Sequence, residues 1–259
     1  MSRSTLRRAL ELKDGSSTAL VPLIWRHAFR LEQMAPGSLP MVAEDMARAL
    51  RNVPLLYGVD AVTLGVDGAH LATACWTAAQ PSLSIDDAWS AVRQRRPLEP
   101  VPDPKSVPAA EPMALLVEVA DRLRSALGEQ AGIAFALPDP AALASLLGVP
   151  DAVSWANRVL IEVVRAVGST EPELVLFYGT EARVQPRLAN MCGFFRTEAF
   201  HLAESVSGKT VLTSRELDDD LALSGEPTWL LTTGAEIPET ADPACLGPAL
   251  LKLRQKLAS

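Results

Sequence analysis

Short apolar runs alternate with amphipathic stretches along most of the chain. Seven runs have the length and continuous hydrophobicity of strands that are buried on both faces, which is typical of a parallel sheet. The predicted strands cover 19–25, 60–66, 132–137, 173–179, 199–205, 209–214 and 228–234. Between them lie stretches with apolar residues at helical spacing, as over 116–127 and 246–257. The alternation predicts an α/β protein built from βαβ units.

Seven strands are compatible with an open doubly wound sheet and with a closed barrel. The 259 residues match a barrel of about 250 residues as well as they match two small domains. No GxGxxG or GxxxxGKS sequence follows any predicted strand, so nucleotide binding of either common type has no support. We expect one domain over 1–259.

A proline-rich segment at 97–112 interrupts the alternation. Its sequence, PLEPVPDPKSVPAAEP, holds six prolines. Because proline fixes φ and lacks an N–H, we expect an extended surface segment rather than a helix or a central strand. A linker between domains is one interpretation. Since predicted strands continue on both sides, we favour a long loop after the second strand that covers the strand-end face.

Composition and charge exclude several classes of protein. The chain is 48% hydrophobic and 21% charged, as in ordinary globular domains. Its net charge of −7 and pI near 5.1 disfavour nucleic-acid binding, and the basic cluster at 93–96 is too short to oppose them. No uncharged apolar run reaches the roughly 18 residues of a membrane span, and 1–15 is amphipathic rather than signal-like. We expect a cytoplasmic protein without nucleic-acid or membrane partners.

Metal sites and disulfides also lack a sequence signal. The three cysteines, Cys75, Cys192 and Cys245, show no CxxC or His-spaced pairing, and we expect them to pack as small apolar residues. The acidic run at 218–220 lacks the spacing and glycine of a calcium loop, so a solvated helix face is the better interpretation.

Cationic side chains follow the first predicted strand, in the sequence WRHAFR. Because parallel sheets bind ligands at the carboxyl ends of their strands, Arg26 and Arg30 fit an anion clamp for a carboxylate or phosphate. A structural ion pair with Glu32 or Glu44 is equally compatible with these residues. His27, between the arginines, is a candidate proton acceptor, although packing in the barrel wall is the alternative that we favour.

A carboxylate follows the second predicted strand. Asp67 comes after AVTLGV and faces the same mouth as the arginines, where it is a candidate for orienting a cationic or N–H-bearing substrate or for shuttling a proton. A turn or helix cap is the alternative. Tyr178 and Glu204 stand at further strand ends and are candidate pocket residues, whereas His70 and His201 are expected to be structural.

Four segments resemble the uroporphyrinogen decarboxylase superfamily. WRHAFR is similar to the RQAGR signature of that family, and GVDAVTLGVD is similar to its second-strand segment, which ends in FSD. IAFALPDPAALASLLG resembles its third strand and loop, and LLTTGAEIPETADPACLG resembles its final strand with the G-x-x-P turn and last helix. The resemblance spans most of the chain. It implies a parallel (β/α)8 barrel of the TIM type, here shortened, with its site at the carboxyl ends of the strands.

The resemblance also implies roles for three candidates. Arg26 and Arg30 match the arginines that hold substrate carboxylates, and Asp67 matches the aspartate that hydrogen-bonds pyrrole nitrogens.

Two groups of the decarboxylase site have no counterpart. The tyrosine of the third loop falls near Ala144 or Ser145, and the histidine before the final turn falls at Gly234. The methyltransferase branch binds zinc through a His-x-Cys pair and a later cysteine. That cysteine position falls at Ala235, and no His-x-Cys occurs in the chain, so zinc activation lacks its ligands.

The leading hypothesis is a metal-independent, cofactor-free lyase that acts on a small or pyrrole-like polycarboxylate and differs from uroporphyrinogen decarboxylase itself. The alternatives are a corrinoid-dependent methyltransferase-like enzyme and a non-catalytic binding protein that retains the barrel. A homodimer is left open. The catalytic candidates are Asp67 and His27, and the substrate-binding candidates are Arg26, Arg30, Tyr178 and Glu204.

Overall fold

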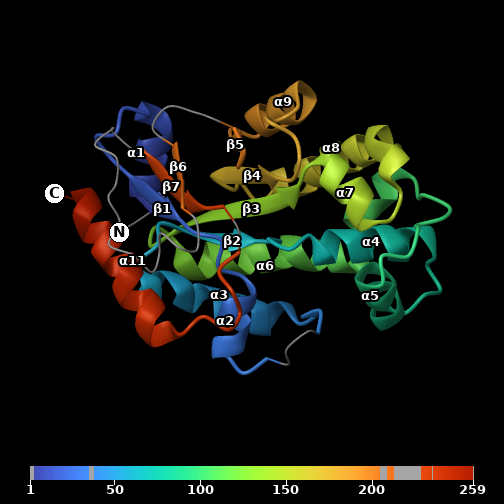
Figure 1. Ribbon diagram of the computed structural model, residues 1–259, viewed down its shortest axis with the longest axis horizontal. Coiled ribbons are helices and arrows are strands. Elements are labelled where there is room, and N and C mark those ends of the chain that lie inside the picture. Colours follow the sequence, from blue (N-terminus) through green and yellow to red (C-terminus); the bar gives the residue numbers. More distant parts are fainter. Residues whose placement is uncertain (1–2, 35–37, 205–208, 213–228, 235, 259) are drawn as a thin grey trace.

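The computed structural model describes residues 3–34, 38–204, 209–212, 229–234 and 236–258, and parallel strands form its centre (Figure 1). Each of the seven predicted strands is present. The strands are β1 (Ala19–Val21), β2 (Ala61–Leu64), β3 (Gly132–Pro138), β4 (Leu174–Tyr178), β5 (Glu198–His201), β6 (Lys209–Leu212) and β7 (Leu230–Thr233).

The strands form two parallel sheets, with the orders β1-β7-β6 and β2-β3-β4-β5. Asp60, just before β2, connects them. Its N–H donates to the Leu20 carbonyl of β1, and its Oδ2 accepts the Leu20 N–H, each at 2.9 Å. These two bonds to Asp60, one of them through its buried carboxylate, connect β1 and β2 in place of a regular backbone hydrogen-bond ladder. The two strands therefore lie side by side at their amino ends.

The structure confirms the α/β class and the parallel strand direction. The shortened (β/α)8 barrel stays a prediction, because the described residues show two parallel sheets and 205–208, between β5 and β6, lie outside them. The first strand is shorter than the predicted run 19–25, since β1 ends before Pro22, which has no N–H to give a ladder.

Helices cover the sheets, and α3 and α6 pack side by side (Figure 1). The apolar stripe predicted over 116–127 lies in α6 and is buried at Leu116, Ala120 and Leu123. The α-helices are α1 (Arg3–Leu12), α2 (Arg26–Leu31), α3 (Ala43–Tyr57), α4 (Ala69–Ala79), α5 (Ile85–Arg93), α6 (Glu111–Leu127), α7 (Pro140–Leu146), α8 (Val153–Gly168), α9 (Pro186–Phe194) and α11 (Pro243–Ala258), and the short 3₁₀ helices are η1 (Pro104–Ala109) and η2 (Pro150–Ala152).

The proline-rich segment 97–112 is not extended throughout, so that prediction was wrong. It contains η1 and the start of α6, because proline is well tolerated in a first helical turn. Asp103 caps η1 by accepting the Lys105 N–H, and Val107 is buried. The Trp155 indole N–H also donates to the Pro102 carbonyl at 2.8 Å, so the segment is packed against α8.

The cysteine prediction holds for two of the three residues. Cys75 and Cys192 are buried as expected, but Cys245, near the start of α11, is exposed. The acidic run at 218–220 lies outside the described residues.

Candidate functional site

The structure brings Arg26 and Asp67 together at the carboxyl ends of β1 and β2. Arg26 begins α2, and Asp67 lies in the turn between β2 and α4. The Asp67 Oδ2 accepts from both Nε and Nη2 of Arg26, at 2.9 and 2.7 Å. Its Oδ1 accepts the Ala69 N–H at 3.0 Å, so this carboxylate is both an ion-pair partner and a turn residue. Arg26 therefore pairs with Asp67, and not with Glu32 or Glu44.

Glu236 is a site residue that the sequence analysis missed. It follows β7, and its Oε1 accepts the backbone N–H of Arg26 at 2.6 Å. Burial raises the pKa of Glu236 to about 7; the Asp67 carboxylate adds to this rise, while the Arg26 N–H opposes it. Near neutral pH this carboxyl group therefore exists in both protonation states. The available signal was its place in the GAEIP turn, one residue after the position of the absent zinc ligand.

Tyr178 ends β4 and directs its hydroxyl toward the same region. This Oη is buried and has no hydrogen-bond partner among the described residues. A Cβ added at Gly68 would lie 2.9 Å from it, so only glycine leaves room for the phenol beside Asp67. Burial, together with the negative charges of Asp67 and Glu236, raises the pKa of Tyr178 well above its usual value. The group is consequently a neutral phenol at physiological pH.

Asp139 and His201 form a buried contact between the ends of β3 and β5, at a distance of 3.2 Å from Asp139 Oδ2 to His201 Nε2. Asp139 also accepts the Ala142 and Glu181 N–H groups at 2.6 and 2.8 Å. Its bonds hold α7 and the loop after β4, which makes it a positioning group beside the site.

Three sequence candidates lie at the edge of the site or outside it. Arg30 donates to the backbone carbonyls of Glu239 and Ala241, at 2.9 and 3.4 Å, and so ties α2 to the segment after β7. His27 lies in α2 rather than at the strand end. Its Nε2 is 2.7 Å from the Tyr57 hydroxyl, and burial lowers its pKa, so the ring fits a packing role between α2 and α3.

Glu204 stays close to the strand ends. Its Oε2 accepts the His201 N–H at 3.4 Å, just beyond β5. His70 behaves as the sequence predicts for a structural histidine, since it is buried in α4 with its Nε2 2.8 Å from the Pro40 carbonyl.

The space beside the Arg26–Asp67 pair is small. A cavity of about 20 Å³ is lined by both residues together with Trp25, Phe29 and Glu239, among others. This volume holds about one water molecule. While Arg26 is paired with Asp67 this space holds no larger molecule, so a ligand that binds Arg26 has to displace Asp67.

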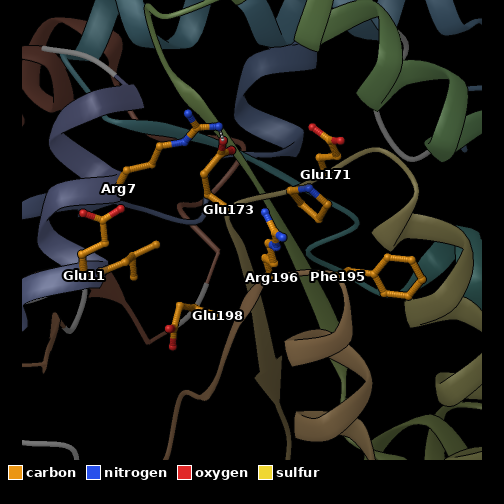
Figure 2. A pocket seen from close by; sticks show the side chains of 9 residues that line it. Arg7, Glu11, Glu171, Glu173, Phe195, Arg196 and Glu198 are labelled. Carbon is orange, nitrogen blue, oxygen red and sulfur yellow. Dashed lines mark hydrogen bonds and ion pairs between the residues drawn. The ribbon is translucent and has the colours of Figure 1, made fainter.

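A larger groove of about 490 Å³ lies at the opposite, amino ends of the strands (Figure 2). In it Arg7 points toward Glu173, which precedes β4 and also pairs with Arg3 and Arg124. Glu173 Oε2 further accepts the Ile133 N–H at 2.9 Å. Because its carboxylate is satisfied by these fixed partners, the groove fits a structural ion cluster better than a reaction site.

The described residues offer no metal site. No group of three or more His, Cys, Asp or Glu with suitable geometry occurs among them. The cysteines lie on α4, α9 and α11, so they supply no paired thiolates. No helix within the described part of the chain is long and apolar enough to cross a membrane.

These observations define a parallel α/β protein with a cluster of polar side chains at the carboxyl ends of its strands. A methyltransferase from Methanosarcina mazei is similar in structure, with a TM-score of 0.67 and 13% sequence identity over 98% of this chain and 99% of that chain. No known family model matches the sequence, and neither does any curated protein. At this identity the likeness shows the fold alone.

Proposed function

We propose that the protein transfers a methyl group to or from a small carboxylated molecule bound at the carboxyl ends of its strands. The observation that carries the proposal is the convergence of Arg26, Asp67, Glu236 and Tyr178 at this end of a methyltransferase-like fold. The lyase hypothesis gains no comparable support from the structural neighbour.

The zinc that serves the corrinoid-dependent branch does not fit the described residues, because three convergent ligands are lacking among them. No step is therefore assigned to zinc or to a corrinoid.

The residues of the site have distinct chemical capacities. Arg26 supplies a planar guanidinium for a substrate carboxylate, which then takes the place of Asp67. A nitrogen, oxygen or sulfur atom that loses a methyl group must gain a proton, and one that accepts a methyl group must lose one. Glu236, with a pKa of about 7, is suited to give or take that proton, and Tyr178 supplies a neutral hydrogen-bond donor.

The test uses small carboxylates that carry a ¹³C-labelled N-, O- or S-methyl group. Each is incubated with a small thiol or with reduced cobalamin as acceptor, and methyl resonances are followed by NMR. We expect the wild-type protein to transfer the methyl group. In Glu236→Gln we expect the transfer rate to fall by a factor of about 10² or more. Glu118→Gln, an exposed change on α6, is the matched control and retains the rate.

Failure of every donor to lose its methyl group would reject methyl transfer. Release of ¹³CO₂ from carboxyl-labelled substrates would instead favour the lyase reaction. Saturable binding without either reaction would favour the non-catalytic alternative.

A further inference from the structure

The Arg26–Asp67 pair restricts which molecules the site can accept. Asp67 Oδ2 takes two hydrogen bonds from the guanidinium, and the two side chains are only 28% and 17% exposed. A ligand carboxylate that binds Arg26 must displace Asp67. A lone anion would consequently leave a partly buried carboxylate without its cation, which is strongly unfavourable.

Neighbouring carboxyl groups make the displacement of Asp67 by a lone anion still less favourable. Glu236 and Glu239 add carboxyl groups near Asp67, and Asp67 already contributes to the raised pKa of Glu236. Arg30, the other arginine of α2, donates to two backbone carbonyls. Asp67 therefore needs a new cationic partner whenever a ligand carboxylate pairs with Arg26.

A lone cation meets the opposite difficulty. An organic ammonium that takes Asp67 away from Arg26 leaves the guanidinium next to Trp89, whose ring centroid is 5.9 Å from Arg26 Cζ. A cation–π contact of this kind replaces only part of an ion pair with two hydrogen bonds. Separating Arg26 from Asp67 is compensated only when the guanidinium gains a new anion and the carboxylate gains a new cation.

A second, independent observation also points to a polar ligand. The Tyr178 hydroxyl is buried at the same strand ends and has no hydrogen-bond partner among the described residues. A buried polar group of this kind ordinarily has a partner. Because Tyr178 is a neutral phenol, it can accept from an ammonium N–H or donate to a carboxylate.

From these relations we infer that the ligand is a small amino carboxylate, whose carboxylate pairs with Arg26 and whose ammonium group pairs with Asp67 and Glu236. The inference rests on the site named in the proposed function and deepens it by giving the substrate class. The partner exchange keeps every charge compensated. An N-methylated amino acid meets both requirements and carries a methyl group.

The test compares three probes of similar size by isothermal titration calorimetry at pH 8. Sarcosine carries both charges, acetate carries the negative one, and methylammonium carries the positive one. We expect sarcosine to bind at least tenfold more tightly than acetate or methylammonium. Acetate or methylammonium binding as tightly as sarcosine would overturn the inference.

Substitution of Asp67 gives a sharper readout than loss of binding. Asp67→Asn keeps an oxygen for the Ala69 N–H but releases Arg26. We expect it to weaken sarcosine at least tenfold and to strengthen acetate, so that the preference between the two probes reverses. Unchanged preference in Asp67→Asn would contradict the partner exchange.

Glu236→Gln supplies an independent variant in case Asp67→Asn fails to fold. It removes the charge but keeps an oxygen for the Arg26 N–H, and we expect sarcosine binding to weaken several-fold at pH 8. Glu118→Gln should bind all probes like the wild type. Equal sarcosine affinity in Glu236→Gln and Glu118→Gln would argue against the ammonium site.

Sarcosine binding without methyl transfer would reject the proposed reaction alone, whereas transfer from methylated carboxylates that lack an amine would reject this inference alone.

Discussion

His201 donates its Nε2–H to Asp139 Oδ2 at 3.2 Å and thereby joins the ends of β5 and β3. The Ala203 N–H donates to His201 Nδ1 at 3.1 Å, which places the ring proton on Nε2. Asp139 also accepts two backbone N–H groups from α7 and from the loop after β4. This buried cross-link holds the ends of β3, β4 and β5 in place next to the site. Loss of one of the two acceptor oxygens of Asp139 should therefore destabilise the protein.

Asp139→Asn is expected to destabilise the protein by about 2–3 kcal/mol. The amide offers only one acceptor oxygen, and its NH₂ group would face donors that now point at a carboxylate. Thermal or urea unfolding measures the change. Asp103→Asn is the control, because Asp103 is also a helix cap but is exposed, and its side chain accepts the Lys105 N–H from its own turn. Equal losses in the two variants would show that Asp139 is merely a cap.

Gly179→Ala tests the close approach of the loop after β4 to the same aspartate. Gly179 has a φ of 149°, and a Cβ there would overlap the Asp139 carboxylate. We expect a loss of about 1–3 kcal/mol in the free energy of unfolding. Gly193→Ala, in α9, has no atom within 4 Å of the added Cβ and is expected to gain about 0.5 kcal/mol. A neutral Gly179→Ala would show that the loop relaxes without cost.

The strands were predictable because burial on both faces requires continuous apolar runs, and such runs survive in the sequence. The same logic brought Arg26 and Asp67 to one mouth, since parallel strands end at a common edge. What the sequence could not give was the partner of Arg26, because the two residues are 41 positions apart and Glu32 and Glu44 were nearer in the chain.

Two site groups escaped the sequence analysis for different reasons. Asp139 precedes Pro140 at a helix start, and this pattern is indistinguishable from an ordinary cap until His201 is seen beside it. Glu236 has a local sequence that suggested only an absent zinc ligand, and its raised pKa depends on burial that no sequence pattern records. The error at 97–112 came from treating proline as a helix breaker, although it begins helices readily.

Glu173→Gln is expected to cost about 3 kcal/mol, because it leaves Arg3, Arg7 and Arg124 around an uncharged amide. Chemical denaturation measures the loss. Glu129→Gln is the control: Glu129 contacts Arg3 at 3.5 Å but is 71% exposed, so its removal should change stability by less than about 0.5 kcal/mol. Similar effects of the two changes would contradict the role of the buried cluster.

The same carboxylate gives an acid-dependent stability. Burial alone would raise the pKa of Glu173, but the Ile133 N–H and the Arg3 and Arg124 guanidinium groups outweigh it and lower the pKa below its usual value. A lowered folded-state pKa means that this contribution is present above the unfolded-state pKa of about 4.3 and is lost as the pH falls below it. Wild-type protein should therefore lose stability below about pH 4.5 more steeply than Glu173→Gln.

Glu236 is expected to produce the opposite pH dependence. Its folded-state pKa, about 7, lies above that of the unfolded chain, so the folded protein binds more protons between about pH 4.5 and 7. Stability should then fall as the pH rises through this window and level off above it, by about 3 kcal/mol in total. Glu236→Gln keeps the oxygen that accepts the Arg26 N–H but cannot ionise, so its loss of stability over the same window should be smaller by that amount. Urea denaturation of both proteins at several pH values from 4.5 to 8 measures the difference. Parallel stability curves would show that Glu236 ionises without cost, and the protonation role proposed for it in methyl transfer would lose its physical basis.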